Sequence, residues 1–242
     1  RDRLRSRGLG DVYKRQMYAT IYGMVDNIIT ITSNSIQSAL GQIFNTDRKR
    51  YMELHEVFET YYLALVFSLL AIATIFILPF MKLYTEGSDI NYIDWKLPVL
   101  FGMYQLLSYG RVPSNMVIGF ANEFKTTQWR ACLEAIINLA VSFVCVFKFG
   151  IYGVLFGTIA ALIYRANDVI IFANHHIFKR SMWPTYRKWG VNAIIFILIV
   201  ILFLEISLKL DSYIGLFMNA IWISICICLL YTSPSPRDRS LS

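Results

Sequence analysis

Charged side chains are scarce in this sequence. Only 16% of its 242 residues are Asp, Glu, Lys or Arg, whereas 56% are hydrophobic, and the mean hydropathy is +0.50. Soluble domains usually carry about a quarter of their residues as charges, so the composition excludes an ordinary soluble domain. It predicts an integral membrane protein.

Cysteine and histidine are also few. The chain has four cysteines and three histidines, and no two cysteines have the C-x-x-C spacing of zinc and redox sites. His175 and His176 are adjacent, so on a helix their side chains point about 100° apart and do not readily share a metal ion. We therefore expect no disulfide framework, no metal site and no cofactor.

Most of the formal net charge of +7 lies at the two ends, in residues 1–16 and 228–242. The segments "DVYKRQ" (11–16) and "CLLYTS" (228–233) are translations of one DNA sequence read in opposite directions, which resembles a library-preparation adapter. We expect both ends to be adapter-derived and residues 17–227 to be an open fragment of the natural protein. Residues 17–227 carry no polybasic patch, so nucleic acid is not an expected partner.

Seven apolar stretches have about the 20 residues that a helix needs to cross a bilayer. The first is the most polar, since it contains Asp26, Asn27 and several serines. The predicted spans are residues 18–44, 58–81, 97–120, 128–147, 151–174, 189–208 and 213 onward. The sequence thus predicts an all-α membrane protein with about seven transmembrane helices.

Charge alternates between successive connections. Lys and Arg are concentrated in residues 48–50, 125–130 and 179–188, whereas residues 82–96 and 209–211 mix Lys with Asp or Glu and residue 148 is a single Lys. The positive-inside rule places the first group in the cytoplasm. The basic and aromatic loop 175–188 is expected either along the cytoplasmic lipid surface or as a plain solvated loop.

Glycines mark a tight helix–helix turn in "FGIYGVLFGT" (149–158). Gly150 lies at the turn, and Gly153 and Gly157 are four residues apart at the start of the next span. Small residues at this spacing let two helix backbones approach closely in lipid.

The longer run "EFKTTQWRACLEAIINLAVSFVCVFKFGIYGVLFGTIAALIYR" (123–165) resembles the polysaccharide and O-antigen flippases of the MOP (multidrug/oligosaccharidyl-lipid/polysaccharide) superfamily. "SNSIQSALGQI", "LPFMKLYTEG" and "GRVPSNMVIGFANEFK" extend the resemblance over most of residues 17–188. The chain departs from the family at Gly41 and Gln42, where many members have a proline.

The resemblance implies a two-lobe MOP/MATE-like transporter of the bacterial cytoplasmic membrane. Residues 17–174 would form five helices of a partial second lobe, 175–188 a cytoplasmic interfacial loop, and 189–227 two extra C-terminal helices. The implied function is to flip undecaprenyl-pyrophosphate-linked oligosaccharide for surface polysaccharide synthesis. Its partners would be that lipid-linked oligosaccharide, membrane lipids and other polysaccharide-assembly membrane proteins.

Three alternatives remain open, one of which is a polytopic scaffold with no transport role. A multidrug or cation antiporter of the same superfamily needs an acidic cation site, for which Asp26 and Glu134 have some depth. A membrane enzyme of glycan processing usually presents His, Asp or Arg clusters at a membrane face, but the outer connections here are short, and the longest, 83–96, has no histidine. We therefore expect no catalytic residues and a protein that is not an enzyme.

Arg111 and Pro113 interrupt the third span. A central Arg costs about 2.5–3.5 kcal/mol to insert, so it needs a partner, and Glu134 and Arg165 lie at a similar depth. In one interpretation Arg111 pairs with Glu134 and Arg165 with Asp168. In the other, Arg111 and Arg165 face a cavity and attract the pyrophosphate.

Two further residues, Asn138 and Asp26, complete the candidate cavity set. Pro113 cannot donate a backbone hydrogen bond, so it is expected to kink the third span and to leave the carbonyl of Tyr109 without its usual helical partner. Gly150, Gly153 and Gly157 are expected to have structural roles.

Overall fold

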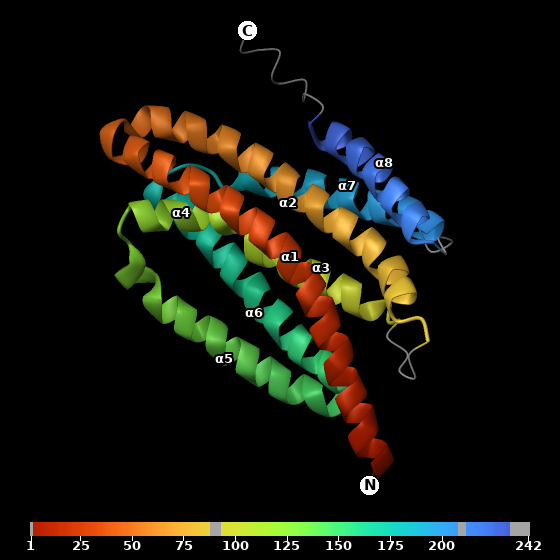
Figure 1. The fold of residues 1–242 in the computed structure, drawn as a ribbon. Coiled ribbons are helices and arrows are strands. Elements are labelled where there is room, and N and C mark those ends of the chain that lie inside the picture. The colour runs from red at the N-terminus through yellow and green to blue at the C-terminus, as the bar shows by residue number, and fades with distance from the viewer. Residues whose placement is uncertain (1, 88–92, 208–211, 233–242) are drawn as a thin grey trace.

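The chain forms a bundle of α-helices in a computed structural model, which describes residues 2–87, 93–207 and 212–232. No β-strand occurs within these ranges. The helices are α1 (Asp2–Thr46), α2 (Arg48–Tyr84), α3 (Lys96–Gly110), α4 (Val112–Phe120), α5 (Phe124–Phe149), α6 (Ile151–Ile171), α7 (Trp183–Ser207) and α8 (Tyr213–Thr232), and the π-helix η1 (Phe172–Ile177) continues α6 (Figure 1).

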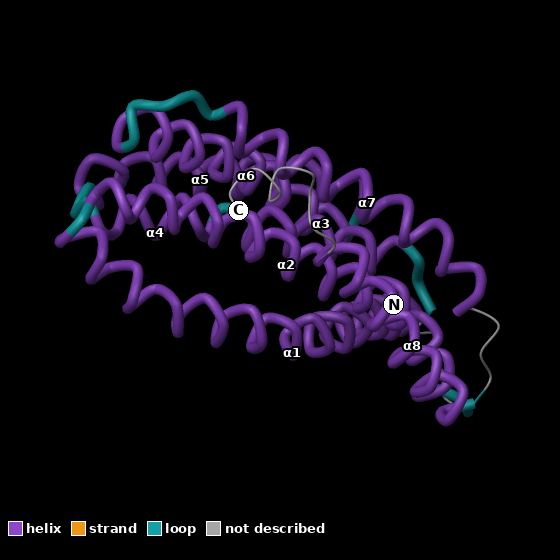
Figure 2. Tube along the Cα trace, turned by 90° about the horizontal axis from the view of Figure 1, so that it is seen from above, coloured by secondary structure: helices purple, strands orange, loops and turns teal. Residues whose placement is uncertain are grey.

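The central element is α2, which packs against α1, α3, α7 and α8. Figure 1 shows α5 beside α6 on one flank of the bundle and α8 on the other flank, beyond α2. Turned by 90°, Figure 2 shows α1 along one face and α5, α6 and α7 toward the opposite face. The core follows α2, whose buried residues include Leu63, Val66, Leu70 and Ile77.

Within the part of the chain that the structure describes, four helices are long and apolar enough to cross a membrane, which indicates a multi-pass membrane protein. They are α2, α5, α6 continued by η1, and the first 20 residues of α7. The apolar part of α8, Tyr213–Ile227, is shorter, and the third predicted span is divided into α3 and α4. Four of the seven predicted spans are therefore helices of sufficient length and apolar composition, and the other three stay predictions.

The long helix α1 is polar for a span, but its hydroxyl groups bond to the helix itself. Thr32 donates to the carbonyl of Ile28 and Ser35 to that of Ile31, both at 2.8 Å. Such internal bonds lower the cost of placing a hydroxyl in lipid. Residues 2–16 continue the same helix. From residue 12 on, where burial is described, Val12 and Tyr13 are exposed and Tyr18 is the first buried residue.

An aromatic cluster joins three connections at one end of the bundle. Tyr51 packs edge-on against Phe44 and Phe120, with ring centroids 4.8 and 6.0 Å away, and Phe178 lies 6.2 Å from it. The α1–α2, α4–α5 and η1–α7 connections therefore meet at this end, on the left of Figure 1, which we name the basic end. The charge pattern assigns these same three connections to one side.

Tyrosines gather at the opposite end. Tyr152 donates to Asp94, Tyr18 accepts from the Asp94 backbone N–H at 3.3 Å, and Tyr213 donates to the carbonyl of Leu83 at 2.9 Å. Of the charges assigned to this side, Asp89, Lys209 and Asp211 lie outside the described residues.

The predicted loop 175–188 is mostly helical. η1 continues to Ile177 and α7 begins at Trp183, six residues before the predicted start of the span. The cause is Glu59 of α2, which is only 2% exposed. It accepts hydrogen bonds from Thr185 at 2.9 Å and Lys188 at 2.8 Å, which draws the first turns of α7 onto α2.

A labelling experiment tests which end faces the cytoplasm. In variants whose own cysteines are replaced by serine, Glu86→Cys and Asn122→Cys place single thiols at exposed sites at opposite ends of the bundle. We expect a membrane-impermeant thiol reagent to label residue 86 in intact cells, and residue 122 only after permeabilisation. Equal labelling of both residues in intact cells would contradict this orientation.

Candidate functional site

The site begins where the third predicted span is broken. α3 ends at Gly110, Arg111 lies between the helices, and α4 starts at Val112. Pro113 falls in the first turn of α4, where its missing N–H removes no helical hydrogen bond. The carbonyl of Tyr109, whose usual helical donor would be the N–H that Pro113 lacks, accepts the backbone N–H of Arg111 instead.

On its other side the site is bounded by α5 and α6, which pack closely against each other. Gly150 turns the chain between them with φ at +58°, a conformation that disfavours residues with a side chain. A Cβ atom at Gly153 would overlap the backbone of Cys145, and one at Gly157 would lie 2.8 Å from the carbonyl oxygen of Asn138. The glycines thus lie where α6 meets α5 most closely.

Five charged side chains from these helices form one connected group, which we name the charged network. Glu134 of α5 joins two helices, since its Oε1 lies 3.3 Å from Nη1 of Arg111 and its Oε2 lies 3.5 Å from Nε of Arg165 on α6. Asp168 accepts from Nη1 of Arg165 at 3.0 Å and also from Arg130 of α5. The network therefore links the helix break to both α5 and α6.

The network holds three guanidinium groups against two carboxylates, so it carries one positive charge in excess. Its side chains are 11–25% exposed, with Arg165 and Asp168 the most buried. Arg130 also lies over the ring of Phe172 at 4.9 Å, and its Nε has no hydrogen-bond partner within the described part of the chain. Mutual pairing makes these charges tolerable among apolar helices, yet it leaves the site electropositive.

Both pairs that the sequence suggested are present. Arg111 contacts Glu134 and Arg165 contacts Asp168, which agrees with the structural interpretation of these residues. The sequence missed that Arg130 belongs to the same group. The spacing of the two residues could have predicted this, because Arg130 lies one helical turn before Glu134 and therefore on the same face of α5.

Asn138 and Asp26 lie outside the network. Asn138 is one turn further along α5, where it accepts a hydrogen bond from Ser142 at 3.0 Å at the contact with α6. Asp26 of α1 is hydrogen-bonded by Tyr109 and Gln105 of α3. The two candidates thus belong to different helix contacts.

The surroundings of Asp26 form a second polar group. Two oxygen atoms there are buried without a hydrogen-bond partner among the described residues, namely Asp26 Oδ1 and Gln105 Oε1. Only Asp26 among them is acidic, so the group is rich in oxygen but carries little negative charge. This combination suits a water molecule or a monovalent cation better than a divalent one.

Within the described ranges, no three His, Cys, Asp or Glu side chains lie close enough to hold a metal ion. His176 instead stacks on Phe172, with ring centroids 4.8 Å apart.

Comparisons with protein-family models, curated proteins and solved structures each found no match for this chain. The family suggested by the motifs therefore stays a proposal.

Neutralising Asp168 tests whether the network supports the fold. Asp168→Asn keeps the shape of the side chain but leaves the positive charge of Arg130 unpaired in a mostly buried site, and it leaves Arg165 with only its contact to Glu134. We expect the free energy of unfolding to fall by about 3–5 kcal/mol, measured by thermal denaturation in detergent. Glu53→Gln removes one negative charge at an exposed site and should change it by less than about 0.5 kcal/mol. Equal stability of the two variants would contradict a structural role for the network.

Proposed function

We propose that this chain is part of a transporter that flips undecaprenyl-pyrophosphate-linked oligosaccharide across the bacterial cytoplasmic membrane for surface polysaccharide synthesis. Four motifs in the order found in the MOP-superfamily flippases support the proposal, as do the apolar helices. In this proposal residues 17–174, which run from α1 into η1, belong to the second lobe. Residues 175–188 form the interfacial connection, and residues 189–227, in α7 and α8, form the two extra C-terminal helices.

One observation carries the proposal, namely the surplus positive charge of the charged network among apolar helices. A structural ion-pair group needs only balanced charges, and an extra guanidinium is costly in lipid. A pyrophosphate cargo offers a compensating negative charge, and the planar fork of Arg111 or Arg165 can donate two parallel hydrogen bonds to phosphate oxygens. Arg111 lies at a helix break, where local rearrangement disturbs the fewest helical bonds.

The second candidate is a cation-coupled antiporter of the same superfamily, favoured by the group around Asp26. Buried oxygen atoms without partners beside one carboxylate are a suitable environment for a monovalent cation or a proton. The two candidates differ in cargo, so glycan export and drug susceptibility of one set of variants distinguish them.

Substitution of Arg111 tests the flippase proposal. Arg111→Gln removes the surplus charge but leaves Glu134 paired with Arg165, so the protein should accumulate in the membrane near its normal level. We expect surface glycan export to fall about tenfold or more, because the contact to pyrophosphate is charge-assisted. Arg111→Lys keeps the positive charge but loses the planar fork, so its glycan export should lie between that of the unchanged protein and that of Arg111→Gln.

Arg187→Gln is the matched control, since it removes one exposed positive charge outside the network. Its export should equal that of the unchanged protein. Normal export by a normally accumulating Arg111→Gln variant would rule out cargo binding by Arg111. Loss of drug resistance in Asp26→Asn with intact glycan export would favour the antiporter instead.

A further inference from the structure

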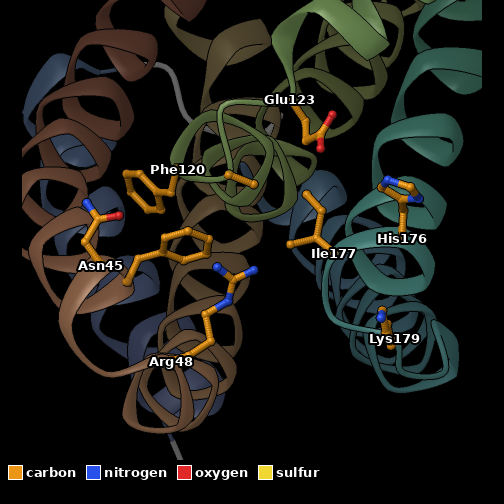
Figure 3. A pocket seen from close by; sticks show the side chains of 9 residues that line it. Asn45, Arg48, Phe120, Glu123, His176, Ile177 and Lys179 are labelled. Atoms are coloured by element: carbon orange, nitrogen blue, oxygen red, sulfur yellow. The ribbon is translucent and has the colours of Figure 1, made fainter.

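A pocket with a volume of about 440 Å³ opens at the basic end of the bundle. It lies where the α1–α2, α4–α5 and η1–α7 connections meet, and Figure 3 shows its side chains converging from all three. Phe44, Phe120 and Ile177 form apolar parts of its wall, and polar side chains supply the rest. The pocket shares no residue with the charged network, whose members lie at the α3–α4 break and on α5 and α6.

Two cations line the pocket without a counter-ion. Arg48 lies over the ring of Phe44, with its Cζ 4.1 Å from the ring centroid, and Lys179 enters from the η1–α7 connection. Among the described residues neither forms an ion pair. In Figure 3 both lie in the lower half of the view, Arg48 on the left and Lys179 on the right, so an anion in the pocket can lie between the two groups.

The connection that carries Lys179 is held in place. Lys179 has φ of +51°, in the left-handed region that residues with a side chain rarely adopt. The next residue, Arg180, donates its backbone N–H to the carbonyl of Asn174 at 2.9 Å and its Nε to Asn174 Oδ1 at 2.8 Å. These bonds hold the unfavourable turn and direct Lys179 toward the pocket.

Glu123 stands across the pocket from the two cations (Figure 3). Its Oε2 accepts a hydrogen bond from Thr126 at 2.5 Å, whereas its Oε1 has no partner within the described ranges. With His176 counted as neutral, Arg48, Lys179 and Glu123 give the pocket one net positive charge. That charge matches a phosphodiester, which carries one negative charge, better than a phosphomonoester or a pyrophosphate.

We propose that this pocket binds a phospholipid headgroup, with its phosphodiester between Arg48 and Lys179 and its amine or hydroxyl group donating to Glu123. A guanidinium and an ammonium together provide charge-assisted hydrogen bonds to phosphate oxygens. The apolar wall suits the glycerol and first methylene groups of a lipid. The position agrees with the side on which basic residues meet anionic headgroups.

A soluble phosphate compound shares this chemistry, so the test separates the two sources. The proposal does not rest on the transport function and holds for any membrane protein with this pocket. Binding is measured by native mass spectrometry of the purified full chain with phosphatidylethanolamine, phosphatidylcholine or inorganic phosphate. The two lipids share the phosphodiester, but choline has no N–H to donate to Glu123.

We expect phosphatidylethanolamine to bind several-fold more tightly than phosphatidylcholine. The double variant Arg48→Gln with Lys179→Gln should raise the dissociation constant for phosphatidylethanolamine about tenfold. The control double variant Arg50→Gln with Lys125→Gln removes two neighbouring exposed cations that do not line the pocket, and it should bind like the unchanged protein. If both double variants bind the lipid equally weakly, general surface charge explains the loss of binding, and the proposal is overturned.

Glu123→Met, which removes both acceptor oxygens, provides an independent test of the headgroup. It should keep binding to both lipids but lose the preference for ethanolamine over choline. Retention of that preference would refute the role of Glu123. Binding of inorganic phosphate with no binding of either lipid would overturn the phospholipid assignment in favour of a soluble ligand.

Discussion

An ionised side chain among apolar helices is stable only when opposite charges surround it, and this constraint organises one flank of the bundle. Arg111, at the break between α3 and α4, reaches Glu134 on α5, and Glu134 is shared with Arg165 on α6. Asp168 closes the group by pairing with Arg165 and Arg130. No member can be removed without changing the electrostatic environment of a second helix.

The network in turn depends on backbone proximity. Gly153 and Gly157 let α6 lie against α5 so closely that short carboxylate side chains can reach across. The most apolar part of α5 is not buried within the described structure, so α6 and the network hold it in place. In the proposed transporter this outward surface of α5 faces lipid or the other lobe.

Much of this flank was predictable from the sequence. Counting residues from the ends of the spans placed Arg111 and Glu134 at similar depth, and the glycine spacing indicated the α5–α6 contact. The pairing of Arg130 with Asp168 was missed because it depends on how each helix is rotated about its axis, which hydropathy does not specify. The early start of α7 was also missed, since it follows from the buried carboxylate of Glu59 on a distant part of the chain.

The central claim is that Arg111 and Glu134 stabilise each other across the helix break, and a double-mutant cycle tests it most directly. The free energy of unfolding is measured in lipid nanodiscs for the unchanged protein, Arg111→Gln, Glu134→Gln and the double variant. If the pair interacts as the structure shows, the double variant will be more stable than the sum of the single losses predicts, by at least about 1 kcal/mol. Additive losses in four folded proteins would contradict the account.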